Sequence, residues 1–535
     1  MNSPTTWRII FNFFKRLCLV LVPLCLFSTE PSRLCAQDDS LSIRQLLQQD
    51  SLLTRIGIRQ PARLRQFYSL VNQSPAWLDN LVRRDSALAL LEQAGDLGLS
   101  TTAYRPDYFK SLAIATDPTL PCRAWLLADM QLSDALLRFF ADLNYGSHPA
   151  LAHDGLPEPD INTAVATLLA EARRQDRLST SALAIANRSP LMTTLLQRIR
   201  LLNQRCSEAN GNEAPILSTR VHPANGPLVQ KLYLLGFADS PIVKADSSLR
   251  RMLRLCQKSL SLLADGQLRS TSLEELNQPV ASRLAALRLS LAYYRWLYSL
   301  LNRQTLALVN IPSASLVLYA GDSVHLRMRM IVGKPLTPTP ALSAVIDGVE
   351  LYPYWVVPHS IIAKEWLPAM QRDPDYAAAG NFQVLDRKGK RQDPAAINWK
   401  AIPADGFPYI VRQATGCDNA LGLLKLHFEN PFGVYLHDTP DKSLFMLNRR
   451  FFSHGCMRME NPLGIGRYLL GSRSVAIDTL TEKGCLQHQQ PVFLEVEQPL
   501  RLVVWYNPAG VDENGSVVFY PDIYNRLGRL LRGLP

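Results

Sequence analysis

Residues 435–458 read YLHDTPDKSLFMLNRRFFSHGCMR, and they hold the clearest chemical signal in the chain. Cys456 supplies a thiol, and His437 lies nineteen positions before it. A thiol is a strong nucleophile only as its thiolate, so a catalytic cysteine needs a base beside it. Gly455 leaves the backbone before the cysteine free to turn, which lets consecutive N–H groups point at a developing oxyanion. The stretch therefore makes Cys456 a candidate nucleophile, although free cysteines are more often small buried hydrophobic residues.

Short apolar runs on either side predict how this pair meets. The segment 433–437 is typical of a short strand, and 438–440 ends it in a turn. A second apolar run, 444–447, leads toward the Ser-His-Gly-Cys turn. We therefore expect two adjacent strands, or strand ends, to bring His437 beside Cys456.

The spacing of these residues resembles a known signature. His437, fifteen intervening residues, Ser453-His454-Gly455-Cys456 and then Arg458 are similar to the motif of the L,D-transpeptidase (YkuD-type) catalytic domain. Members of that family acylate or cross-link bacterial peptidoglycan through a cysteine thioester. The resemblance implies the same chemistry here, with neither a metal nor an organic cofactor.

The resemblance also implies a role for each residue of the motif. Cys456 is the nucleophile and His437 the general base, held through the backbone carbonyl of Asp438. His454 takes an orienting or oxyanion-side role, because its ring cannot easily reach the sulfur of so near a neighbour. The backbone N–H groups of Gly455 and Cys456 are the candidate oxyanion donors. The Asp438 side chain has a second interpretation, as the residue that starts the following turn.

Five further residues are candidate substrate contacts. The planar guanidinium of Arg458 suits a stem-peptide carboxylate, although a surface ion pair would explain it as well. Tyr435 is a strand residue whose hydroxyl faces the site, and Trp355 either lines the substrate groove or packs in the core. Ser453 leads into the cysteine, and Asn419 belongs to an Asn-Ala-Leu-Gly loop similar to one in the family.

Composition is that of an ordinary globular protein, and it narrows the choice of partners. The formal net charge of +11 fits either a solvated basic surface or attraction to a polyanion such as the cell wall or acidic lipid. Nucleic acid is not expected as a partner, because no block of Lys and Arg with interleaved aromatics occurs. Nine cysteines without a CxxC pair argue against a disulfide scaffold and a zinc site. Cys417, near the family-like loop, either forms a disulfide or competes with Cys456 for electrophiles.

The first 36 residues predict export. Three basic residues precede an apolar run, Leu17–Phe27, which is shorter than a full membrane span. Cleavage after Ala36 gives a soluble periplasmic protein, whereas an uncleaved run gives an inner-membrane anchor. Either outcome places the chain outside the cytoplasm.

An α+β multidomain architecture is expected for the rest. Periodic apolar residues predict an all-α scaffold over 37–215, and residues 216–300 resemble a small three-helix peptidoglycan-binding module with a connecting helix. Strand patterns follow, and by resemblance residues 301–475 form a β-sandwich-like catalytic domain with a lid inserted at about 362–407. Residues 476–535 are expected to add closing strands, at 492–496 and 502–506, and a terminal helix. This order resembles the long, multidomain L,D-transpeptidases.

The match of the three-helix module is partial. Asp265-Gly266 and Leu276-Asn277 fit the family, but Arg269 or its neighbours stand where a second glycine is expected. The region is therefore either a wall-binding unit or a purely structural one.

The predicted function is acyl transfer on wall peptides. Cys456 attacks the carbonyl of the third residue of a tetrapeptide stem, D-alanine leaves, and an amine of a neighbouring stem resolves the thioester as a 3–3 cross-link. Two alternatives stay open: a non-catalytic peptidoglycan-binding protein, and a cysteine peptidase or L,D-carboxypeptidase. A papain-like peptidase would place its cysteine before its histidine, and here His437 comes first.

Overall fold

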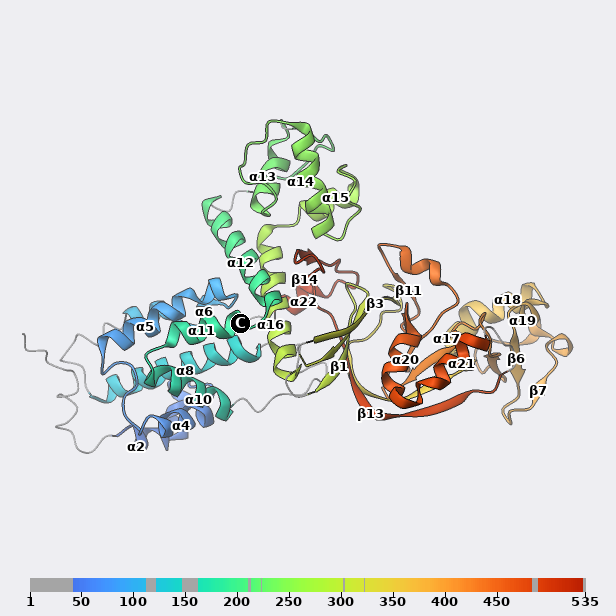
Figure 1. The fold of residues 1–535 in the computed structure, drawn as a ribbon, viewed down its shortest axis with the longest axis horizontal. Helices are drawn as coiled ribbons and strands as arrows, with labels where there is room; N and C mark the ends of the chain where they lie inside the picture. Colours follow the sequence, from blue (N-terminus) through green and yellow to red (C-terminus); the bar gives the residue numbers. More distant parts are fainter. Residues whose placement is uncertain are drawn as a thin grey trace, which may run out of the picture.

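The computed structural model describes residues 42–111, 122–146, 162–209, 213–222, 224–301, 304–321, 323–483 and 489–532. The expected leader over 1–36 lies outside these ranges. Helices occupy the chain as far as Leu301 and strands dominate from Thr305 onward (Figure 1). The predicted α+β order is thus confirmed. None of the helices in the described ranges has the length and apolar character needed to cross a membrane.

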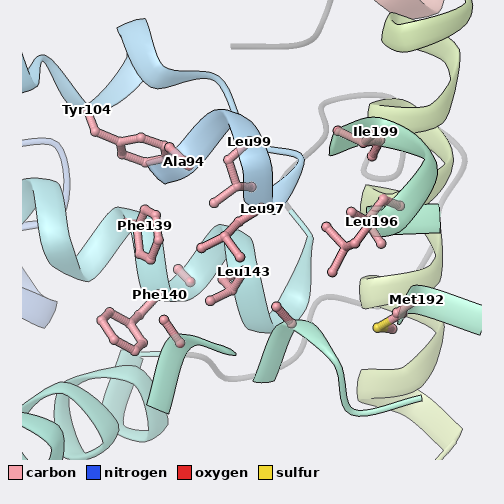
Figure 2. Packing of buried hydrophobic residues seen from close by; sticks show 14 of the residues in the cluster. Ala94, Leu97, Leu99, Tyr104, Phe139, Phe140, Leu143, Met192, Leu196 and Ile199 are labelled. Carbon is pink, nitrogen blue, oxygen red and sulfur yellow. The ribbon is translucent and has the colours of Figure 1, made fainter. Parts of the chain in front are cut away.

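The front of the chain is a helical bundle. Its main helices are α2 (Ile43–Leu47), α3 (Asp50–Arg55), α4 (Pro61–Leu70), α5 (Leu81–Glu92), α6 (Thr101–Tyr104), α7 (Pro106–Ser111), α8 (Cys122–Tyr145), α10 (Asn162–Arg174), α11 (Leu178–Ala186) and α12 (Pro190–Glu208). Apolar residues at helical spacing meet in one core, where Tyr104, Phe139 and Phe140 form edge-to-face contacts beside Leu97 and Leu143 (Figure 2).

A buried carboxylate on α8 fixes the turn before α5. Asp129 accepts the backbone N–H groups of Ala76, Trp77 and Leu78 at 2.9, 2.8 and 2.9 Å, and the Tyr68 hydroxyl at 2.6 Å. Asp129 is fully buried, so these donors replace the water that the carboxylate loses on folding. The scaffold thus depends on one helix side chain to hold an irregular segment.

The helix α16 (Val280–Leu301) joins the bundle to the sheet. It packs along α12 and meets the end of strand β13 (Val492–Trp505) (Figure 1). The Trp505 ring lies 5.2, 5.7 and 6.3 Å from the rings of Tyr293, Tyr294 and Trp296. One continuous hydrophobic core therefore runs from the helical front into the sheet.

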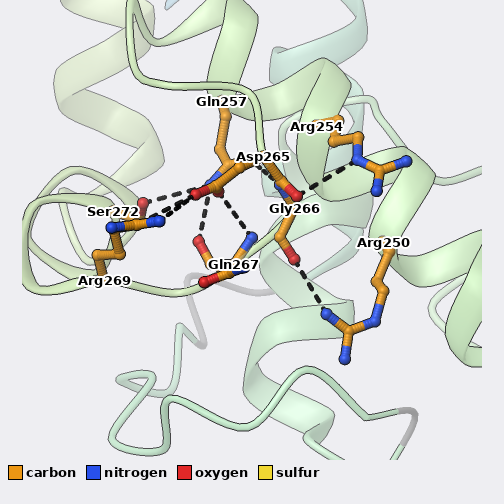
Figure 3. Close-up of polar contacts among 8 residues, drawn as sticks. All are labelled: Arg250, Arg254, Gln257, Asp265, Gly266, Gln267, Arg269 and Ser272. Carbon is orange, nitrogen blue, oxygen red and sulfur yellow. Dashed lines mark hydrogen bonds and ion pairs between the residues drawn. The ribbon is translucent and has the colours of Figure 1, made fainter.

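The three-helix module consists of α13 (Gly226–Leu234), α14 (Asp246–Ser259) and α15 (Ser270–Leu276). Its Asp265 carboxylate accepts bonds from the Gln267 N–H at 2.9 Å and from Arg269 at 2.7 Å (Figure 3). The buried Gln257 side chain accepts the Gly266 N–H at 2.8 Å. These contacts use the Asp265-Gly266 pair to close a loop within the module. Arg269, the departure from the family pattern, is part of that closure.

Two serines attach the module to the C-terminal hairpin of β14 (Ala509–Val511) and β15 (Val517–Phe519). Ser259 Oγ donates to the Val517 carbonyl at 2.6 Å, and Ser261 Oγ donates to the Phe519 carbonyl at 2.8 Å. The module is therefore tied to the same core region as α16.

The catalytic region is a nine-stranded mixed sheet in the order β11-β3-β12-β10-β9-β4-β13-β1-β2. Its strands are β1 (Thr305–Asn310), β2 (Ser315–Ala320), β3 (Ser323–Gly333), β4 (Leu342–Leu351), β9 (Leu424–His427), β10 (Leu436–His437), β11 (Phe451–Ser453), β12 (Met457–Met459) and β13. Because β3 also pairs with β2, the sheet closes on itself. Helices α20 (Pro462–Leu470) and α21 (Val475–Lys483) follow β12, and α22 (Leu527–Leu531) ends the described chain.

One strand prediction needs correction. The runs near 492–496 and 502–506 are a single strand, β13, rather than two separate ones. From Glu495 to Leu500, β13 advances by five residues. Its partner β4 advances by only two over the same stretch, from Gly348 to Ile346. A bulge absorbs the extra residues, including Pro499, which has no N–H to give to a ladder.

The insertion that we expect to act as a lid is a small unit with its own core, and its sheet extends beyond 362–407, from Trp355 to Gln413. Strands β5 (Trp355–Val356), β6 (Phe382–Leu385), β7 (Arg391–Gln392) and β8 (Ile410–Gln413) form a four-stranded sheet, with α17 (His359–Ile361), the π-helical turn η2 (Ile362–Trp366), α18 (Leu367–Arg372) and α19 (Tyr376–Ala379) beside it. Trp366 packs edge-to-face on Trp399 at 5.3 Å and on Phe407 at 6.3 Å.

Replacing Asp129 by asparagine should lower the free energy of unfolding by about 2–4 kcal/mol, because an amide NH₂ would then face backbone donors in a buried site. Urea unfolding followed by circular dichroism measures the change. Asp85→Asn, which removes an exposed carboxylate paired with Arg84, should cost under about 1 kcal/mol. Equal midpoints for the two variants would contradict the assignment.

Candidate active site

Strand pairing brings the candidate residues together. β10 and β12 run parallel, with Leu436 opposite Met457 and His437 opposite Arg458. Side chains of directly opposed residues share a face, and the face repeats every second residue. Tyr435 and His437 of one strand therefore project on the same side as Cys456 and Arg458 of the next. The run 444–447, by contrast, falls mostly in the 3₁₀ turn η5 (Lys442–Met446) and adds no strand.

The opposite face of these strands is buried and holds the register. Leu424, Leu426, Leu436 and Met457 are fully buried in the core of the sheet. Helix α20 covers them, and its Gly466 comes so close that a Cβ would lie 2.8 Å from Leu424. A slip of one residue would move these apolar side chains to the solvent face, so the catalytic face is strongly specified.

The thiol of Cys456 is held by an aromatic pair. The Tyr435 hydroxyl donates to the sulfur, and the Trp355 indole donates to the Tyr435 hydroxyl. Burial raises the pKa of Cys456, and the Tyr435 contacts, with the charges of Lys425 and Arg458, offset only part of that rise. The resting group is therefore a neutral thiol. Trp355 thus contacts the site through Tyr435, and it also packs against the core of the 355–413 insertion, with its ring 6.3 Å from that of Phe382.

The imidazole of His437 is also neutral. Only 4% of the residue is exposed, and burial, followed by the charges of Arg458 and Lys425, lowers its pKa to about 3. Contact with the Asp438 backbone carbonyl raises the pKa of His437. The family resemblance implies this contact, although His437 Nδ1 makes no hydrogen bond of good geometry. A neutral imidazole has a free lone pair with which to accept a proton.

Two predicted binding residues instead build the turns. The buried Ser453 hydroxyl donates to the Cys456 carbonyl at 2.5 Å and accepts the Gly455 N–H at 3.2 Å. Asn419 is fully buried, donates to the Ala414 carbonyl at 2.8 Å and accepts the Leu421 N–H at 2.7 Å. Each side chain is buried and hydrogen-bonded within its own loop, so a contact with substrate stays a prediction for both.

Gly455 adopts φ +114°, a conformation that favours glycine and forms the sharp turn before the thiol. The Gly455 N–H must break its hydrogen bond to Ser453 Oγ before it can donate to an oxyanion. Asp438 also acts in a turn: its carboxylate accepts the Leu423 and Thr439 N–H groups at 2.9 and 2.7 Å and pairs with Lys442. Its carbonyl, rather than its side chain, is what reaches His437.

His454 points to the lid rather than to the sulfur. Its Nε2 lies 2.7 Å from Glu365 Oε1 on the π-helical turn η2 and 3.2 Å from Lys334 Nζ. One ring nitrogen cannot donate to a carboxylate and accept from an ammonium at once, so the two contacts compete. The motif histidine therefore connects the nucleophile turn to the lid.

Charged side chains extend the site across the sheet. Arg458 is partly buried, burial lowers its pKa, and it forms no ion pair within the part of the chain that the structure describes. Lys425 lies opposite His437 on β9 and pairs with Glu350 of β4 at 3.0 Å. Sequence reasoning missed Lys425 and Glu350. The alternation Leu-Lys-Leu-His over 424–427 was the signal for Lys425, since it places this residue on the same side as His427.

Cys417 is disulfide-bonded, whereas Cys206, Cys256 and Cys456 are free thiols. Cys417 therefore does not compete with the candidate nucleophile. The described residues contain no cluster of three or more side chains suited to a metal ion.

A free thiol, a neutral imidazole and a free guanidinium on one sheet face define a site for acyl transfer through cysteine. Residues 304–470 match the family model of the L,D-transpeptidase catalytic domain, and residues 62–198 match that of the scaffold domain. The chain thus carries a catalytic domain of this cysteine transpeptidase family behind an N-terminal scaffold domain.

A putative L,D-transpeptidase of Haemophilus influenzae is 36% identical over 224 residues, which are 40% of this chain and 43% of that protein. The aligned region thus spans less than half the length of that curated relative. Among solved structures, an L,D-transpeptidase from Mycobacterium smegmatis is 14% identical, with 38% of this chain and 58% of that chain covered and a TM-score of 0.18. L,D-transpeptidase 3 from Mycobacterium tuberculosis is 12% identical, with 38% and 60% covered and a TM-score of 0.18.

The rate of Cys456 alkylation by iodoacetamide should rise by about tenfold per pH unit from pH 6 to beyond 8.5, which is the ordinary pKa of a thiol. The reason is that burial holds the pKa of Cys456 above that ordinary value. Intact mass and peptide mapping report the rate, with Cys456→Ser as the control. A plateau below pH 7 would reveal a preformed thiolate and contradict the neutral pair.

Glu365→Gln should loosen the lid, because it removes the charge that faces His454. Limited proteolysis within 362–407 should become up to about fivefold faster, the scale of an exposed ion pair. Lys364→Gln, one position earlier on the same turn, is the matched control and should leave the rate unchanged. Identical cleavage rates for both variants would show that the contact does not hold the lid.

Proposed function

We propose that the protein is a peptidoglycan L,D-transpeptidase that forms 3–3 cross-links in the cell wall. The observation that carries the proposal is the single sheet face on which Cys456, His437 and Arg458 lie together. The match of residues 304–470 to the family supports it.

The first half-reaction is acylation of the thiol. His437 takes the Cys456 proton as the sulfur attacks the carbonyl carbon of the third stem residue, which gives a tetrahedral oxyanion beside the Cys456 N–H. The oxyanion collapses, the bond to D-alanine breaks, and the imidazolium returns the proton to the departing amine. A thioester and free D-alanine result.

The charge on Arg458 links substrate binding to this step. In the free protein that charge helps to depress the pKa of His437. A stem carboxylate bound at the guanidinium would offset the charge and make the imidazole a stronger base. The pKa of His437 would then rise only when a donor is bound, and Cys456 would form little thiolate in the absence of a donor.

The second half-reaction is transfer to an amine. The side-chain amine of a diamino acid on a neighbouring stem attacks the thioester, His437 accepts its proton, and the thiol is regenerated as the amide forms. The lid, joined to the nucleophile turn through Glu365 and His454, limits water at this stage. Export to the periplasm, by the leader over 1–36, is part of the proposal.

Incubation of the protein with a disaccharide-tetrapeptide should release D-alanine and give a dimeric product, as measured by mass spectrometry. Cys456→Ala should abolish both, and His437→Ala should lower acylation by about 10²–10⁴ fold, the usual contribution of a general base.

Arg473→Ala, which changes an exposed arginine bonded to Glu495, serves as the control and should react at the wild-type rate. Monomeric tripeptide alone would favour an L,D-carboxypeptidase. No release of D-alanine, with an alkylatable thiol, would favour a binding protein.

A further inference from the structure

The sheet face that carries Cys456 continues across three more strands. Beside Cys456 lies Tyr435 on β10, and beside Tyr435 lies His427 on β9. Gly348 of β4 is directly opposite His427. Together these four positions form a row that leads away from the nucleophile, next to the row of Glu350, Lys425, His437 and Arg458.

Phe493 ends this row. It comes from β13, where it pairs with Glu350, and its ring lies across Gly348. A Cβ at position 348 would lie 2.3 Å from the ring, so only glycine lets the ring rest on the strand. The His427 imidazole meets the ring edge-on, with centroids 5.5 Å apart and planes at 89°.

The aromatic pair is held in place and remains open. His427 Nδ1 lies 2.6 Å from the Asp347 carboxylate, which fixes the imidazole, while half of Phe493 stays exposed. A cavity of about 730 Å³ follows the β9–β10 hairpin, and Lys425, His427 and Tyr435 are among its lining residues. The open face of a phenyl ring, held beside a polar imidazole, can contact the apolar face of a ligand.

The distance from the thiol selects the part of the substrate that fits. Neighbouring strands lie about 4.8 Å apart. His427 is two strands from the Cys456 position, which is ~10 Å, and Phe493, over Gly348, is three strands away, which is ~14 Å. The stem residue that is attacked is the third from the sugar. Three extended residues span ~10 Å, so the sugar reaches the aromatic pair when the stem runs along this row.

We propose that Phe493 and His427 form a carbohydrate platform for the amino sugar that bears the donor stem. The pyranose ring has an apolar C–H face, which stacks on the exposed phenyl ring, and hydroxyl and acetamido groups at its edge, which meet the polar rim at Asp347 and Lys425. The platform rests on the proposed transpeptidase function, and it adds a preference for donors that still carry their glycan.

The test compares two donors, a free tetrapeptide and the same tetrapeptide on its disaccharide. D-alanine release gives kcat/KM for each with wild-type protein, Phe493→Ala and Val492→Ala. Val492 is a matched control, because it is similarly exposed at 46% but alternates to the opposite side of β13. We expect a wild-type preference for the disaccharide donor that falls about fivefold in Phe493→Ala, the scale of one aromatic stacking contact, and persists in Val492→Ala. Release from the free tetrapeptide should be the same in all three proteins.

The remaining outcomes separate the platform from the proposed function. If wild-type protein uses both donors equally, or if Phe493→Ala keeps the preference, the platform is wrong while the transpeptidase assignment stands. If no protein releases D-alanine, the transpeptidase assignment fails. Titration calorimetry with the disaccharide-tripeptide then decides the platform, and equal affinity for wild type and Phe493→Ala overturns it.

Discussion

The parallel pairing of β10 with β12 is the constraint on which the site depends. It sets His437 against Arg458 and Tyr435 beside Cys456 through backbone hydrogen bonds. Both strands are very short, so their register comes from the leucines and methionines pressed against α20 on the opposite side. The geometry of the catalytic face is therefore a product of the hydrophobic face behind it.

The same burial that fixes the geometry also sets the charge state. Removal from water disfavours both the thiolate and the imidazolium, and neighbouring cations press the histidine further toward its neutral form. The resting site carries the positive charge of Arg458, whereas the charge of Lys425 is offset by Glu350. In the proposed reaction, the bound substrate completes the electrostatics of the site, so no permanently activated thiol is needed.

Much of the architecture could be predicted from sequence, because helical and strand periodicity are strong in this chain and the His…Ser-His-Gly-Cys spacing is specific. The roles of Ser453 and Asn419 could not. Hydroxyl and amide side chains serve a turn as readily as a ligand, and only burial distinguishes the two. The bulge in β13 could not be predicted, because a proline such as Pro499 usually marks the end of a strand. Lys425 was missed because its importance comes from its pairing with two other strands, which no single stretch of sequence shows.

The cluster of Tyr293, Tyr294, Trp296 and Trp505 has a consequence for how this architecture can evolve. These rings belong to a core that includes the scaffold helices, the connecting helix and the edge of the catalytic sheet. A sheet cut free at residue 301 would leave Trp505 and its neighbours facing water. An exchange of the helical front would therefore have to preserve this buried aromatic contact, which an exchange of linker-joined binding domains does not require.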